Sequence, residues 1–121
     1  MLIFGPSTKL INRRDGIPYD ISIGRDGRWG NKYHMKDKSL AERNRVCDLH
    51  KEDLWRAIRD GSITLSDLDS LYGKTLGCWC VPKRCHGLAV MEAVEWAHNL
   101  LSKYERIRKK YKKRRKKIRV A

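Results

Sequence analysis

The chain has 121 residues, of which 40% are hydrophobic and 35% are charged, and its formal net charge at pH 7 is +14. This length suits one small domain with a modest core, and no apolar run is long enough to cross a bilayer. The apolar start of the chain is too short and too poor in charge for a secretory signal. We therefore expect a cytoplasmic protein in which the four cysteines stay reduced.

The positive charge is concentrated at the C-terminal end of the chain. Residues 1–102 hold 16 Lys and Arg against 13 Asp and Glu, a balance of +3, whereas residues 103–121 hold 12 against one and have a balance of +11. We predict an α/β domain over residues 1–102 and a basic helical tail over residues 103–121.

Two short runs near the start are compatible with β-strands, Lys9–Asn12 and Tyr19–Ile23. A glycine-rich loop follows them, and glycines there permit close approach of the backbone to a bound group. Arginine side chains beside such a loop can hold an anion in a bidentate manner, although a plain turn with its tryptophan packed on the core fits the same pattern. The candidate anion-binding residues are Gly24, Arg25, Arg28, Trp29 and Asn31.

Three helical pieces are predicted in the middle of the chain. Ser39 begins the first with a capping-box pattern, and this piece reaches about His50. The second covers Lys51–Asp60 and is ended by Gly61, and the third covers Ser66–Tyr72. Apart from these, His34 and His50 are expected at the surface and Cys47 inside as a small buried residue.

The strongest strand candidate, Thr75–Cys80, opens a stretch rich in cysteine. Cys78 and Cys80 are two residues apart and leave the same face of a strand. Cys85 stands near the N-terminus of the last helix, where exposed N–H groups favour a thiolate.

Three interpretations of this stretch stay open. Cys78, Cys80, Cys85 and His86 form a chemically sound zinc ligand set, although their spacing is atypical for zinc. Alternatively, Cys85 is a catalytic thiolate with His86 as its base and Arg25 as an anion holder. In the third interpretation the cysteines are small buried residues and His86 only hydrogen-bonds locally.

The order of these elements is typical of a small α/β domain with a short, mostly parallel sheet flanked by helices. Sites in such sheets form at the carboxyl ends of the strands. One predicted strand is followed by Gly24 and Arg25, and the other by the segment 80–86. We therefore expect these residues to share one pocket.

The last helix is predicted to start near Cys85 and to continue to the C-terminus. Val90, Val94, Ala97 and Leu101 repeat at helical spacing and extend to Tyr104 as one packed face. Beyond this face, basic residues predict strong, salt-sensitive binding of DNA or RNA, whereas apolar residues are too few for a membrane-bound helix. The basic residues are Arg106, Arg108, Lys109, Lys110, Lys112, Lys113, Arg114, Arg115, Lys116, Lys117 and Arg119.

Two motifs resemble one family, a small bacterial and bacteriophage domain of unknown function. They are G-R-x-x-x-W-G-N at residues 24–31 and G-C-W-C-x-P-x-x-C-H-G at residues 77–87, and the similarity covers about residues 8–95. The family usually continues the first motif with Asn-Pro-aromatic and the second with Asp, whereas this chain has Asn31-Lys32-Tyr33 and Leu88. The resemblance implies an α/β fold and, for a phage-encoded member, a bacterial host cell.

Taken together, the sequence predicts a phage or bacterial accessory protein that binds nucleic acid through a basic helix and carries a Cys/His site, with zinc as its candidate cofactor. One alternative is a nucleotide- or base-modifying enzyme that uses a cysteine thiolate. Another is a phage-encoded protein that binds a host protein through Trp29 and Trp79.

Overall fold

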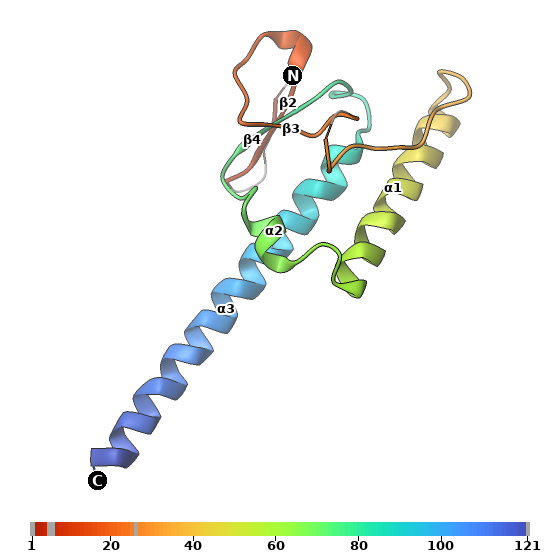
Figure 1. Cartoon of the computed structure of the whole chain (residues 1–121). Coiled ribbons are helices and arrows are strands. Elements are labelled where there is room, and N and C mark those ends of the chain that lie inside the picture. The colour runs from red at the N-terminus through yellow and green to blue at the C-terminus, as the bar shows by residue number, and fades with distance from the viewer. Residues whose placement is uncertain (1, 5–6, 26, 121) are drawn as a thin grey trace.

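The computed structural model describes residues 2–4, 7–25 and 27–120, and for residues 2–4 and 117–120 it describes the backbone alone. Figure 1 shows the chain as a small α/β body from which one long helix projects. The elements are β1 (Leu2–Phe4), β2 (Lys9–Asn12), the 3-10 turn η1 (Arg13–Asp15), β3 (Ile21–Ser22), α1 (Leu40–Asp60), α2 (Leu65–Asp69), β4 (Thr75–Cys78) and α3 (His86–Val120).

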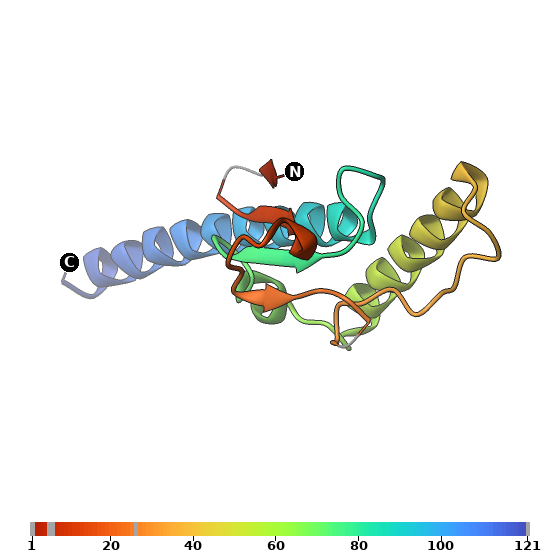
Figure 2. The same cartoon turned by 90° about the horizontal axis from the view of Figure 1, so that it is seen from above.

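The sheet has the strand order β1-β2-β4-β3, and β4 is parallel to both of its neighbours. This arrangement confirms the predicted α/β class with a mostly parallel sheet. Strand β1, which the sequence did not predict, adds an antiparallel edge to β2. Helices α1 and α2 both pack against α3, and Figure 2 shows the strands lying along the first part of that helix.

Helix α1 is one continuous helix, so the predicted division between His50 and Lys51 is wrong. No glycine or proline interrupts the helical hydrogen bonds at that point. Both predicted ends are correct, since the Ser39 hydroxyl accepts from the Glu42 N–H at 3.1 Å and Gly61 closes the helix with a φ of 86°.

Two other predicted boundaries move. Thr64, not Ser66, caps α2, and Thr64 and Asp67 exchange reciprocal side-chain to backbone hydrogen bonds of 2.9 and 3.1 Å. Strand β4 ends at Cys78 rather than Cys80, because the neighbouring strands β2 and β3 offer no ladder partner beyond Cys78. Cys80 therefore lies in a loop, where the alternation of a strand does not fix its direction.

The first part of α3 forms the floor of the core. Val90, Val94 and Ala97 are fully buried, which confirms the predicted packed face for these three residues. The face ends near Leu101, which is half-buried, and Tyr104 is 70% exposed, contrary to the prediction.

Gly87 lets the first turn of α3 approach the sheet closely. A Cβ atom at this position would lie 2.7 Å from Ile23 Cδ1 and 2.9 Å from Leu10 Cδ1, and both of those residues are fully buried. Glycine fits against these two neighbours as they stand, whereas any other residue would require the ends of both buried side chains to shift. Gly87 therefore fixes where the preceding residue, His86, stands.

We expect Gly87→Ala to destabilise the domain by about 1–3 kcal/mol, since the added methyl group overpacks the core. Urea unfolding followed by circular dichroism measures this change, and Leu88→Ala at the exposed neighbouring position serves as the control. A Gly87→Ala variant as stable as the unmodified protein would contradict this account of the contact.

The distal part of α3 extends beyond the domain, as Figure 1 shows. The helix has 35 residues, which corresponds to roughly 50 Å at ~1.5 Å per residue. Every side chain from Ser102 to Lys116 is exposed. The side chains of Lys117 and Arg119 lie outside the described part. Within the described residues, no helix combines the length and the apolar character that a membrane crossing requires.

Candidate functional site

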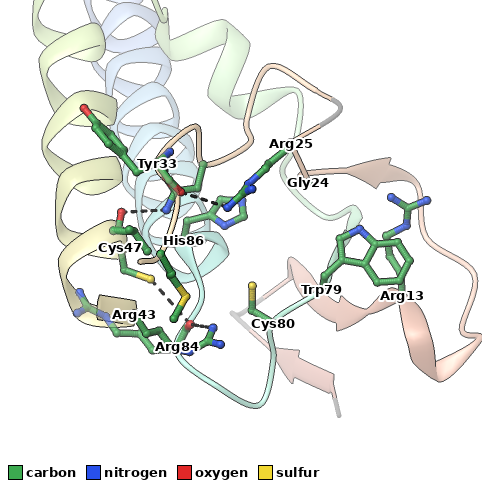
Figure 3. Close-up of a pocket in the computed structure, with 13 residues that line it drawn as sticks. Arg13, Gly24, Arg25, Tyr33, Arg43, Cys47, Trp79, Cys80, Arg84 and His86 are labelled. Atoms are coloured by element: carbon green, nitrogen blue, oxygen red, sulfur yellow. Dashed lines mark hydrogen bonds between the residues drawn. The ribbon is translucent and has the colours of Figure 1, made fainter. Parts of the chain in front are cut away.

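A cavity of about 590 Å³ opens where β3 and β4 end. Figure 3 shows lining side chains that come from the loops after both strands, from η1 and from α1. The lining residues are Arg13, Gly24, Arg25, Asn31, Tyr33, Met35, Arg43, Val46, Cys47, Trp79, Cys80, Arg84 and His86. The site thus occupies the position that an open α/β sheet favours.

The cavity brings together the two motifs that lie far apart in the sequence. Gly24, Arg25 and Asn31 come from the first motif, and Cys80 and His86 come from the second. Asn31 shapes the loop, because its side-chain amide donates to the Val46 carbonyl at 2.9 Å and its amide oxygen accepts from the Tyr33 N–H at 3.0 Å. The pocket predicted from the strand ends is present.

Two residues of the predicted anion site lie elsewhere. Arg28 turns away from the cavity, donates to the Ser62 carbonyl at 3.0 Å and pairs with Asp67 at 3.2 Å. Trp29 is 9% exposed and belongs to the core. Its burial favours the structural interpretation of that tryptophan and removes it from the predicted host-binding surface.

Cys80, Cys85 and His86 form a compact group of potential metal ligands. One ligand atom from each of the three lies within 4.8 Å of the other two. Cys85 Sγ also accepts from the Gly87 N–H at 3.3 Å, a contact that stabilises negative charge on sulfur. Cys78, the fourth predicted ligand, is fully buried in β4 and lies outside this group.

The ring of His86 is fixed in the orientation that a metal ligand needs. Nε2 lies 2.5 Å from the Ile23 carbonyl oxygen, which only accepts hydrogen bonds, so Nε2 carries the proton. In the neutral ring Nδ1 then has the lone pair, and Nδ1 lies 3.7 Å from Cys85 Sγ. A histidine that donates its second ring N–H to a backbone carbonyl is the usual arrangement around bound metals.

The spacing of these atoms agrees with tetrahedral coordination. Zn–S bonds of ~2.3 Å and Zn–N bonds of ~2.0 Å at tetrahedral angles place sulfur and nitrogen about 3.5 Å apart. The observed distance between Cys85 Sγ and His86 Nδ1 is 3.7 Å. The positions of these two atoms are therefore compatible with a bound metal ion such as zinc.

The surroundings shift the pKa values of Cys80 and Cys85 in opposite directions. Hydrogen bonds to Cys78 and Cys80, followed by burial, raise the pKa of the Cys85 thiol, which is opposite to the predicted effect of the helix N-terminus. The hydrogen bond with Cys85, the largest influence, lowers the pKa of Cys80. Cys80 also lines the cavity and Cys85 does not. The structure thus lowers the pKa of the thiol that faces the cavity, Cys80, and raises that of Cys85, which does not face it.

A second histidine lies behind the site. His50, predicted at the surface, is 8% exposed, and its ring lies 4.9 Å from the ring of His86 in an edge-on contact. Burial, followed by the proximity of His86, lowers the pKa of His50 to about 4. His34 is exposed and Cys47 is buried, as predicted.

The residues predicted for the site did not include three arginines that line the cavity: Arg13, Arg43 and Arg84. Arg84 lies inside the cysteine motif, so its place beside the site was available from sequence. Arg13 and Arg43 come from η1 and α1, and no local pattern links them to that motif. Only the packing of distant segments brings them to one cavity.

The comparisons with known proteins identify a family for this chain. Residues 9–96 match the family described as "Domain of unknown function (DUF4326)". The chain belongs to the DUF4326 family. This assignment confirms the resemblance to a small domain family of unknown function, and every lining residue of the cavity falls inside the matched segment.

A curated relative of this DUF4326 protein is an uncharacterized 12.4 kDa protein from the nrdA-td intergenic region of Enterobacteria phage T4. The two are 44% identical over 69 residues, which are 57% of this chain and 61% of the relative. The match thus spans about three-fifths of the length of that relative. No solved structure matches the chain.

Proposed function

We propose that this DUF4326 protein is an accessory protein of a phage or bacterium that binds nucleic acid through the distal part of α3. The observation that carries the proposal is the exposure of every side chain from Ser102 to Lys116 on a helix that leaves the domain. Ten of these side chains are Lys or Arg and one, Glu105, is acidic. Such a helix presents its charge to a partner rather than to its own domain.

The density of this charge matches that of a nucleic acid. The helix from Lys103 to Lys116 spans roughly 20 Å at ~1.5 Å per residue. Over this distance B-DNA presents about 12 phosphate charges, at one charge per ~1.7 Å. Tyr104 and Tyr111, both more than half exposed, supply aromatic faces on which unpaired bases stack.

We also propose that Cys80, Cys85 and His86 bind zinc. Thiolate and imidazole ligands suit this ion, and the fixed tautomer of His86 and its distance to Cys85 Sγ support the assignment. Three protein ligands leave one position of a tetrahedral ion for another group. Cys80 and His86 line the cavity, so that position is accessible from it.

Substitution of four lysines in the full chain tests the binding function. In one variant Lys109, Lys110, Lys112 and Lys113 become Gln, and in its matched control the same residues become Arg. We expect the Gln variant to bind duplex DNA or single-stranded RNA at least about tenfold more weakly, and the Arg variant to bind as the unmodified protein does. Fluorescence anisotropy measures the affinity and circular dichroism verifies the helix content. Equal affinity of the Gln variant would overturn the proposal.

A further inference from the structure

The cavity has a strongly positive lining. Arginines from four separate segments line it, namely Arg13, Arg25, Arg43 and Arg84, and no aspartate or glutamate is among the lining residues. Guanidinium groups around one space repel one another where no anion pairs with them. Arginines spread evenly over a surface would not gather around one space in this way. The gathering of arginines here makes the cavity suited to a negatively charged ligand.

Two of these arginines keep their charge without a carboxylate partner among the described residues. Arg25 hydrogen-bonds with His34 Nδ1 at 2.7 Å and donates to the Tyr33 carbonyl at 3.2 Å. Arg43 donates to the Arg84 carbonyl at 3.2 Å. Neutral acceptors thus hold both groups in place, and a guanidinium fixed in this way loses little entropy when it binds a phosphate.

The other two arginines are already engaged. Arg84 pairs with Asp48 at 2.6 Å and donates to the Asn44 side chain at 3.0 Å. Arg13 lies over the Trp79 ring, 4.5 Å from the ring centroid. Arg25 and Arg43 are therefore the groups with charge available for a ligand.

The opposite side of the cavity has an aromatic surface. Trp79 lines the cavity and is 48% exposed although it is large and apolar. Arg13 supports its ring, and Gly77 leaves room for that support, since a Cβ there would lie 3.0 Å from Arg13 Cγ. A rigid, half-exposed indole beside a cavity provides a platform on which a planar ring stacks.

Figure 3 shows Trp79 and Arg13 on one side of the cavity and Arg43 with Arg84 on the other, with Cys80 between them. A nucleotide has the same polarity, with a flat base at one end and a phosphate at the other. The cavity of about 590 Å³ is in the range of roughly 300–1,000 Å³ that small-molecule sites occupy. Inorganic phosphate alone leaves most of this volume and the indole unused.

From this arrangement we propose that the cavity binds a phosphorylated nucleoside, with its base against Trp79 and its phosphate at Arg25 and Arg43. The site is separate from the basic part of α3, which leaves the domain on its own (Figure 1). The proposal therefore does not rest on nucleic-acid binding by that helix. The ligand is either a free mononucleotide or the phosphorylated end of a strand, since both present the same chemistry.

Isothermal titration calorimetry on the full chain tests this site. The probes are the 5′-monophosphates of adenosine, guanosine, cytidine and thymidine, the four matching nucleosides, and inorganic phosphate. We expect at least one monophosphate to bind about tenfold or more tightly than its nucleoside and than phosphate. Arg25→Gln, Arg43→Gln and Trp79→Ala should each weaken that binding about tenfold. Arg28→Gln, an arginine of the same loop that faces away, should leave it unchanged.

Circular dichroism and zinc analysis of the same samples separate a lost contact from a lost fold or a lost metal. If Arg25→Gln does not fold, Trp79→Ala at a half-exposed position still provides the test.

The two sources of the ligand are distinguished with 5′-phosphorylated and 5′-hydroxyl oligonucleotides, added to the variant in which Lys109, Lys110, Lys112 and Lys113 are Gln. Preference for the phosphorylated end assigns a strand terminus, and preference for the mononucleotide assigns a free ligand. The proposal is overturned if no monophosphate binds below about 1 mM, or if folded Arg25→Gln and Trp79→Ala bind as the unmodified protein does.

Discussion

Cys85→Ser is expected to remove the bound zinc, from about one ion per chain to almost none. Cys85 is only 2% exposed, and its Sγ lies 3.7 Å from His86 Nδ1. Serine at this position replaces a soft, buried sulfur ligand with a hydroxyl group, which is a poor ligand for zinc. An ion present at a thousandfold excess over its dissociation constant stabilises the folded state by about 4 kcal/mol. Its loss should lower the melting temperature by roughly 15 °C or more.

Elemental analysis of protein purified without a metal-affinity tag, with thermal unfolding of the same samples, measures both effects. Cys80→Ser should behave like Cys85→Ser. Cys47→Ser is the matched control, because Cys47 is also buried and near the site but lies outside the ligand group. The metal assignment fails if the unmodified protein holds no zinc after reconstitution under reducing conditions, or if Cys47→Ser loses as much zinc as the other two variants.

The affinity of the protein for duplex DNA is expected to fall steeply with salt. If six to ten of the cations on the distal part of α3 contact phosphates, the affinity should decrease about 10³–10⁵-fold between roughly 50 and 200 mM salt. The described side chains from Lys103 to Lys116 supply ten such cations on an exposed helix, so contacts of this number are available. Anisotropy titrations at four or more salt concentrations give the slope of log K against log salt.

The same titration on the variant with Gln at Lys109, Lys110, Lys112 and Lys113 measures the part that these lysines contribute. Each phosphate contact that is lost should reduce the slope by about 0.9 for duplex DNA, so four lost contacts reduce it by roughly 3 to 4. The Arg variant at these positions should keep the slope of the unmodified protein. A shallow slope that is the same in all three proteins would mean that the helix binds its target without phosphate contacts, or not at all.

Local patterns predicted much of the fold. Ser39 and Gly61 mark the ends of α1 because a cap and a left-handed residue act within one helical turn. The spacing of Val90, Val94 and Ala97 predicted the buried face of α3, since helical period alone decides which side chains share a side. The distal basic helix was equally evident, because no glycine or proline follows Gly87.

Errors arose where distant segments decide the structure. Strand β4 ends at Cys78 because its ladder with its neighbours ends there. His50 is held inside by a hydrogen bond with the Trp29 carbonyl and by the ring of His86. The pKa of Cys85 is raised rather than lowered, because the hydrogen bonds to Cys78 and Cys80 outweigh the effect of the helix N-terminus. None of these contacts can be recognised from the residues of the segment whose structure it determines.

The amino-acid sequence by itself determined the family, the α/β class, the two motifs and the charged helix, since each depends on residues close together along the chain. The tertiary structure alone decided which side chains surround the cavity. It turned Arg28 toward Asp67 and brought Arg13 and Arg43 from separate elements to the strand ends. The physical reason is that a side chain's partners depend on the crossing of strands and helices, which is set by packing of the whole core.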